Sequence, residues 1–235
     1  MWMRADLKMR GKQAFYRNYW SSVVTALIML IITGALTTSN AKRVRDNHSY
    51  RGGSFFSPQA LIYATFTLLA AVIAVGIIVL KIFVGNALLV GGSRFFVLNQ
   101  TDTPKVGTLG YVFKSGNFSN VVIVMFMRDL FTFLWSLLFF VPGVIKFYEY
   151  RMVPYILAEN PAMPREEAFL ISKRMMTGQK WNTFVLDLSF IGWIILSAMT
   201  GGILGIFYVE PYRQATIAEL YSVNRAMAYQ NGYIR

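Results

Sequence analysis

The stretch that decides the fold is GGSFFSPQALIYATFTLLAAVIAVGIIVL, residues 52–80, which contains no charged side chain. An earlier stretch, NYWSSVVTALIMLIITGALTTSNA at residues 18–41, is uncharged as well. A helix needs about 20 mostly apolar residues to cross a bilayer, at roughly 1.5 Å rise per residue, so each stretch is long enough. Together they predict an integral membrane protein.

The composition agrees with this class. Hydrophobic residues make up 55% of the 235 residues and charged residues only 14%, a balance too apolar for an ordinary soluble domain. The net charge is +12, and its basic residues flank the apolar segments. This placement favours attraction to anionic lipid headgroups at the membrane surface over binding to nucleic acid. We therefore expect contacts with membrane lipids, leave room for a membrane protein partner, and expect no nucleic acid.

Apolar segments recur along the whole chain and predict an all-α fold. The expected architecture is a polytopic membrane helix bundle, with six transmembrane helices arranged as three hairpins. Turn formers at Gly91-Gly92-Ser93 are expected to end the second span, and Pro142-Gly143 and Gly201-Gly202 are expected to turn the chain within the later hairpins. The six spans are expected at residues of about 19–39, 59–90, 118–140, 144–158, 183–199 and 203–221.

Two basic amphipathic helices are expected on the cytoplasmic surface, at residues 1–18 and 165–177. Residues 19–235 then form one six-span membrane domain. With six spans, fourteen Lys and Arg residues lie on one side and four in the outer loop, so both termini are expected in the cytoplasm. The sixth span is the least certain to cross fully, because Glu210 and Arg213 could also mark the end of one long fifth span.

A threefold repeat is the best organisational signal. Three times, a basic segment leads into a polar residue and an aromatic residue that open an odd-numbered span. These openings are Arg17-Asn18-Tyr19-Trp20, Gly116-Asn117-Phe118 and residues 178–182. Internal repeats are common in membrane folds that form a site near the bilayer midplane. The alternative is that every such opening independently needs an aromatic anchor.

Eight charged residues within the predicted spans form a candidate intramembrane polar cluster. An unpaired charge at the bilayer centre costs about 2.5 to 3.5 kcal/mol on insertion scales, so each should have a partner. Four acids and four bases favour structural ion pairs, while a polar pathway for an ion or an anionic lipid stays open. The cluster consists of Lys81, Arg128, Asp129, Glu149, Arg151, Asp187, Glu210 and Arg213.

Counting residues from each turn predicts which charges share a depth. Asp187 lies 14 residues before Gly201 and Arg213 lies 12 residues after it, so these two are expected to pair. By the same count, Asp129 and Arg151 differ in depth by roughly 7 Å, an offset that the long side chain of Arg151 can bridge, which makes this the weaker of the two expected pairs. Lys81 has no acid in its own hairpin, so its expected partner is one of the two glutamates of the cluster, Glu149 or Glu210.

Signals for catalysis are nearly absent. The chain has no cysteine, which excludes disulfides, thiolate metal sites and cysteine nucleophiles. Its one histidine, His48, has no HExxH partner, and neither a Walker A sequence nor a GxSxG elbow occurs. We therefore expect a protein that is not an enzyme and has no metal and no cofactor.

Several motifs resemble a known family. They are PGVIKFYEY at residues 142–150, PYILAENP at 154–161, SKRMMTG at 172–178, LSFIGW at 188–193 and PYRQAT at 211–216. Together they resemble the bacterial family called domain of unknown function 975, over nearly the whole chain and most weakly between residues 38 and 116. The resemblance implies a multi-pass protein of the bacterial inner membrane, similar in layout to membrane domains found beside glycerophosphodiester phosphodiesterases. It implies no established activity, so it assigns no functional residues.

Two functions are compatible with these features. In the first, the protein is a non-enzymatic accessory or scaffold subunit in envelope, export or immunity processes, and its surface helices bind the partner. In the second, it is a small transporter or channel-like protein that moves an ion, peptide or lipid through a polar interior. A water-filled cavity reaching Glu149 and Glu210 would favour the second; a filled bundle with an exposed cytoplasmic groove would favour the first.

Overall fold

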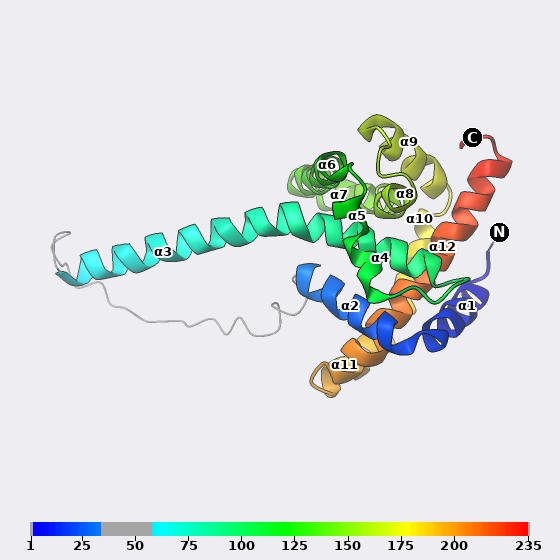
Figure 1. Ribbon diagram of the computed structural model, residues 1–235, viewed down its shortest axis with the longest axis horizontal. Helices are drawn as coiled ribbons and strands as arrows, with labels where there is room; N and C mark the ends of the chain where they lie inside the picture. The colour runs from blue at the N-terminus through cyan, green and yellow to red at the C-terminus, as the bar shows by residue number, and fades with distance from the viewer. Residues whose placement is uncertain (1, 34–57, 235) are drawn as a thin grey trace.

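The computed structural model describes residues 2–33 and 58–234, and every regular element in them is a helix, which confirms the all-α class (Figure 1). Three short elements complete the longer ones: the π-helices η2 (Lys81–Gly85) and η4 (Gly205–Val209), and the 3-10 helix η3 (Val106–Gly110). The α-helices are α1 (Arg4–Arg17), α2 (Tyr19–Thr33), α3 (Pro58–Leu80), α4 (Asn86–Leu98), α5 (Tyr111–Lys114), α6 (Phe118–Leu138), α7 (Phe140–Glu149), α8 (Val153–Glu159), α9 (Arg165–Met176), α10 (Lys180–Leu188), α11 (Ile191–Met199) and α12 (Glu210–Gln230).

Helix α3 projects from the body of the molecule (Figure 1). Its side chains from Leu61 to Leu80 are exposed all round the helix, although nearly all of them are apolar. A helix that is apolar on every face suits a lipid environment. Through η2 the same helix continues into the body as α4, which packs against α2, α8 and α12.

The expected end of this helix at Gly91-Gly92-Ser93 is wrong, because the helix continues to Leu98. The glycines serve close packing instead of termination. A Cβ atom at Gly91 would overlap the carbonyl oxygen of Leu109, and one at Gly92 would overlap the sulfur of Met29. The two glycines thus let η3 and α2 approach the α4 backbone.

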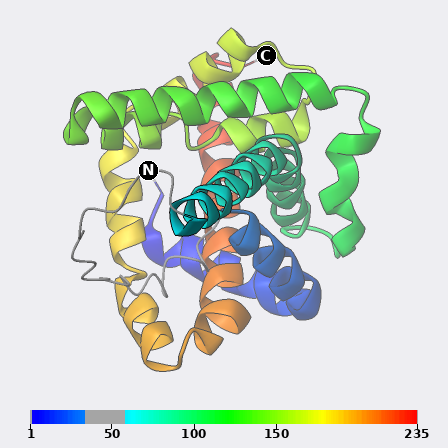
Figure 2. The same ribbon diagram turned by 90° about the vertical axis from the view of Figure 1, so that its left-hand side faces the viewer.

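Three helical segments of the described chain are long and apolar enough to cross a membrane: Leu61–Leu98, Phe118–Leu138 and Lys180–Met199. A fourth is added if α1 and α2, which meet at a bend of 106°, count as one broken span. Figures 1 and 2 show α6 running across the direction of α3. These findings suggest a membrane location, but they do not confirm six spans arranged as three hairpins.

The expected turn between the third and fourth spans is displaced. The chain turns at Phe139, whose backbone is extended, and Pro142-Gly143 lies within the first turns of α7. Proline is tolerated in a first helical turn, and glycine allows close approach, since a Cβ at Gly143 would lie 2.6 Å from the Cα of Ser136. By contrast, the expected turn at Gly201-Gly202 is present, with φ angles of +64° and +90° that favour glycine.

Backbone geometry relates two of the three predicted repeat openings, whereas the first opening differs because Asn18 has a φ angle of −132°. Gly116 and Gly178, which precede α6 and α10, have nearly equal positive φ angles of +73° and +74°. The helices at the three even-numbered predicted spans are each interrupted as well. The interruptions are η2 before α4, residues 150–152 between α7 and α8, and η4 before α12. These shared irregularities favour true repetition over independent membrane anchors.

Both expected surface helices bury their apolar faces inside the molecule. In α1 the buried residues are Leu7, Gly11, Ala14 and Phe15, and this helix packs mainly against α12. The contact is close, since a Cβ at Gly11 would lie 2.8 Å from the Cα of Thr216. Helix α9 packs against α7, α8 and α12 in the same manner. The apolar face of α1 is therefore covered by protein and is not available to a lipid surface.

Candidate functional site

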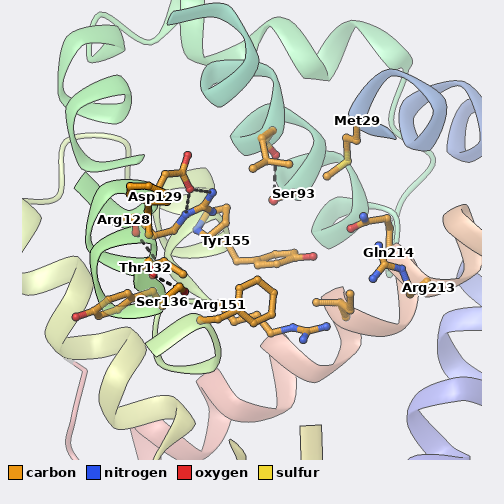
Figure 3. Close-up of a pocket in the computed structure, with 16 residues that line it drawn as sticks. Met29, Ser93, Arg128, Asp129, Thr132, Ser136, Arg151, Tyr155, Arg213 and Gln214 are labelled. Carbon is orange, nitrogen blue, oxygen red and sulfur yellow. Dashed lines mark hydrogen bonds and ion pairs between the residues drawn. The ribbon is translucent and has the colours of Figure 1, made fainter. Parts of the chain in front are cut away.

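The structure contains a cavity of about 460 Å³ between α4, α6, α7, α8 and α12 (Figure 3). Three arginines from different parts of the chain line it: Arg128 from α6, Arg151 from the α7–α8 junction and Arg213 from α12. Its size falls within the range of about 300 to 1,000 Å³ that is typical of small-molecule sites. The remaining lining mixes polar and apolar side chains: Met29, Leu89, Ser93, Asp129, Thr132, Phe133, Ser136, Phe147, Tyr150, Pro154, Tyr155, Gln214 and Ile217.

Arg151 is held by the carboxylate of Asp187 on α10. Its Nη1 and Nη2 atoms donate to the two carboxylate oxygens over 2.5 and 2.8 Å, and Tyr148 Oη donates to Oδ2 over 3.0 Å. The side chain of Arg151 is only 9% exposed. This bidentate pair fixes the α7–α8 junction to α10.

The expected pair between Asp187 and Arg213 is therefore wrong. Counting depth from the turns assumed straight helices, whereas the chain breaks at residues 150–152 and at residues 189–190. Arg151 lies within the first break, where its side chain pairs with Asp187. Arg213 is instead paired within its own helix, because its Nη2 and Nε atoms donate to Glu210 over 2.9 and 3.1 Å. Gln214 Nε2 donates to the same carboxylate over 2.8 Å.

Arg128 pairs with the adjacent Asp129, and the expected pair between Asp129 and Arg151 is wrong. Arg128 donates to Asp129 Oδ1 through Nη2 over 2.6 Å and through Nε over 3.0 Å. Both residues line the cavity, at the middle of α6. The Asp129 side chain is 51% exposed, so this pair lies at an accessible edge of the cavity.

Glu149 lies outside the cavity lining and has two lysine partners. Lys146 Nζ and Lys180 Nζ donate to its two carboxylate oxygens over 2.6 and 2.5 Å. Its carbonyl oxygen also accepts a hydrogen bond from buried Ser172 over 2.6 Å. Sequence reasoning missed both lysines, although Lys146 stands three residues before Glu149, a spacing that brings helical side chains together.

Lys81 is the outlier of the predicted cluster. It is exposed on η2. The expected pair of Lys81 with Glu149 or Glu210 is absent among the described residues, because both glutamates pair with other basic residues. Of the eight predicted residues, Arg128, Asp129, Arg151 and Arg213 thus line one cavity. Asp187 and Glu210 do not line the cavity but form ion pairs with two of its arginines, Arg151 and Arg213. Glu149 and Lys81 lie elsewhere.

Other basic side chains stabilise the body around the cavity by capping backbone carbonyl groups. Lys8 donates to the carbonyl of Ser189 over 3.1 Å at the α10–α11 break, and Arg94 donates to that of Ala158 over 2.6 Å near the end of α8. Cations at helix ends satisfy carbonyls that lack helical partners. Burial, assisted by the charge of Arg4, lowers the pKa of Lys8. Part of the net positive charge therefore serves internal contacts.

Each of the three arginines of the cavity has a carboxylate partner, so the site combines guanidinium groups with carboxylates. A guanidinium group only donates hydrogen bonds and stays protonated, so three arginines suit an anion better than proton transfer. Within the described residues, no group of three or more His, Asp or Glu side chains is placed to hold a metal ion.

Fold and cavity thus define an all-helical protein with candidate membrane spans and an arginine-lined site. Residues 142–226 match the family model described as Protein of unknown function (DUF975), which confirms the family resemblance over this part of the chain. The matched segment includes Arg151, Asp187, Glu210 and Arg213. Neither the curated proteins nor the solved structures provide a match.

Proposed function

We propose that this chain is a non-catalytic, multi-pass protein of the bacterial cell membrane that binds an anionic amphiphile in the arginine-lined cavity. The observation that carries the proposal is the convergence of Arg128, Arg151 and Arg213 on one cavity, whose remaining lining mixes polar and apolar side chains. Planar guanidinium groups match the oxygen geometry of phosphate and carboxylate. Apolar side chains such as Phe133 and Phe147 offer contacts for acyl chains.

The proposed membrane location rests on the candidate spans and on the fully exposed apolar surface of α3. Six spans with both termini in the cytoplasm remain our expectation from the distribution of lysine and arginine. The basic residues of α1 and α9 would then lie at the cytoplasmic face, where anionic headgroups attract them.

The cavity favours a lipid-handling role over an accessory role. An accessory subunit was expected to bind its partner through the surface helices, but α1 and α9 bury their apolar faces and keep mainly charged surfaces for a partner. Glu149 and Glu210 do not line the cavity, whereas three arginines do. This lining supports binding of an anion more than passage of a cation.

The proposal can be tested by lipid retention. The purified protein is exchanged into detergent with equal amounts of phosphatidylglycerol and phosphatidylcholine, and bound lipid is measured by native mass spectrometry. We expect phosphatidylglycerol to be retained preferentially, and the double variant Arg128→Gln and Arg213→Gln to lose most of this preference. Lys114→Gln, which is exposed on α5 and lies outside α1, α9 and the cavity lining, is the control and should behave as the wild type. Equal retention of both lipids by the wild type would refute the proposal.

A further inference from the structure

The three arginines of the cavity differ in how firmly their carboxylate partners are held. Asp187 and Glu210 are 25% and 14% exposed, and each accepts a further hydrogen bond, from Tyr148 and Gln214 respectively. Asp129 is 51% exposed and, among the described residues, accepts its side-chain hydrogen bonds from Arg128 alone. Exposed ion pairs contribute little to stability. Arg128 is therefore the arginine whose partner is most easily exchanged.

The face of α6 that carries Arg128 continues as a polar track into the cavity. Thr132 and Ser136 follow at spacings of four residues, so they lie on the same face of the helix as Arg128, and all three line the cavity (Figure 3). Their hydroxyl groups donate to backbone carbonyls four residues earlier, over 2.8 and 2.7 Å. The hydroxyl oxygens remain available as acceptors for the hydroxyl groups of a ligand.

This track lies in the middle of a candidate span, where a half-exposed carboxylate would be costly against lipid tails. A phosphate group bound to Arg128 would remove the need for Asp129 as counter-ion. The displaced Asp129 carboxylate then needs water as its new partner, so the exchange requires that the open edge of the cavity, where this side chain is 51% exposed, be hydrated. The exchange replaces one anion by another on the same guanidinium and needs no change in the other two ion pairs.

We propose that Asp129 is an internal competitor, which occupies Arg128 in the empty cavity and is displaced by the phosphate of a phospholipid headgroup. This inference rests on the proposed function and adds to it the ligand class, a phosphodiester lipid, and a residue that sets its affinity. A phosphodiester accepts from Arg128 through its two non-bridging oxygens, as a carboxylate does, so it can replace Asp129 on the same guanidinium group.

The test compares binding of short-chain phosphatidylglycerol to the purified full chain and three variants by isothermal titration calorimetry in detergent at low salt. Asp129→Asn should bind about threefold to fivefold more tightly, since it removes a competing exposed ion pair. Arg128→Gln should bind at least fivefold more weakly. The matched control is Glu166→Gln, because Arg165 and Glu166 form the same kind of adjacent pair on exposed α9; its affinity should equal that of the wild type.

Two further titrations distinguish a lipid headgroup from a soluble phosphate as the ligand. Glycerol phosphate and inorganic phosphate should bind far more weakly than the lipid, and equal binding would show that the ligand is a soluble anion. Unchanged affinity in Asp129→Asn, in a protein that still prefers phosphatidylglycerol over phosphatidylcholine, overturns the competitor role and leaves the proposed function standing. Loss of that preference in the wild type overturns the proposed function itself.

Discussion

At the scale of single residues, the pair of Arg151 and Asp187 carries two roles. It ties the α7–α8 junction to α10, and it presents a guanidinium group to the cavity. Tyr148 stabilises the pair by donating to the same carboxylate. In a poorly hydrated site such a pair is costly to break on one side, because the remaining charge keeps no counter-ion.

The pairing of Arg151 with Asp187 predicts the outcome of a double substitution. Asp187→Asn should lower stability by up to about 3 kcal/mol, the lower end of values for broken buried pairs. In a chain of this size such a loss lowers the melting temperature by roughly 6 to 12 °C. Adding Arg151→Leu should restore much of the loss, because no unpaired charge remains. Thermal unfolding of the detergent-solubilised protein measures both effects.

A second double variant discriminates between the two possible partners. Asp187→Asn combined with Arg213→Leu should be at least as unstable as Asp187→Asn alone, since Arg213 is paired with Glu210. Recovery in this variant, with none in the Arg151 variant, would contradict the pairing described here.

At the scale of the helices, glycine positions decide how closely α4 packs against its neighbours. The contact of Gly91 with η3 is with backbone atoms, which cannot rotate away as a flexible side chain can. Gly76 in α3 offers the opposite case, because no atom lies within 4 Å of where its Cβ would be. Both residues belong to the same long helix, so they form a matched pair.

We predict opposite outcomes for alanine at these two glycines. Gly91→Ala should destabilise the protein by about 1 to 3 kcal/mol, the usual cost of overpacking. Gly76→Ala should be neutral or stabilise by up to about 1 kcal/mol, because alanine favours the helix. Melting temperatures of the two purified variants check the prediction. Equal stability of both variants would mean that η3 does not press on α4.

The helices and turns also indicate how much of the fold can be predicted from the sequence. Uncharged length and periodicity predicted helices that begin at Tyr19, Phe118 and Arg165, and the turn at Gly201-Gly202 followed from local chemistry. The turn at Phe139 was missed, because proline and glycine can equally enter a helix and allow close packing. The helix breaks at residues 150–152 and 189–190 depend on contacts distant in sequence, so no local pattern signalled them.

The candidate site was predicted only in part, again because helix breaks depend on contacts distant in sequence. Charges are rare in this chain, so Arg128, Arg151 and Arg213 were conspicuous within apolar segments, and the structure brings them to one cavity. Their pairings were wrong where broken helices changed the depth of each residue. The neutral lining residues, Ser93 and Tyr155 among them, could not be singled out, because serine and tyrosine are common throughout the sequence.

At the scale of the whole molecule, the body encloses a cavity with three arginines, and an apolar helix projects from it (Figures 1 and 3). The internal lysines and arginines that cap carbonyls or pair with acids hold this body together. We propose that this cavity selects an anionic phospholipid from the surrounding membrane.

Photo-crosslinking in living cells tests this claim most directly. Leu89 lines the cavity and is partly buried, whereas Phe66 is exposed on α3, so each is replaced in turn by benzoylphenylalanine, and lipid adducts are identified by mass spectrometry after irradiation. We predict that adducts at position 89 are enriched several-fold in anionic phospholipid, whereas those at position 66 reflect the bulk membrane. The same lipid composition at both positions would contradict the account.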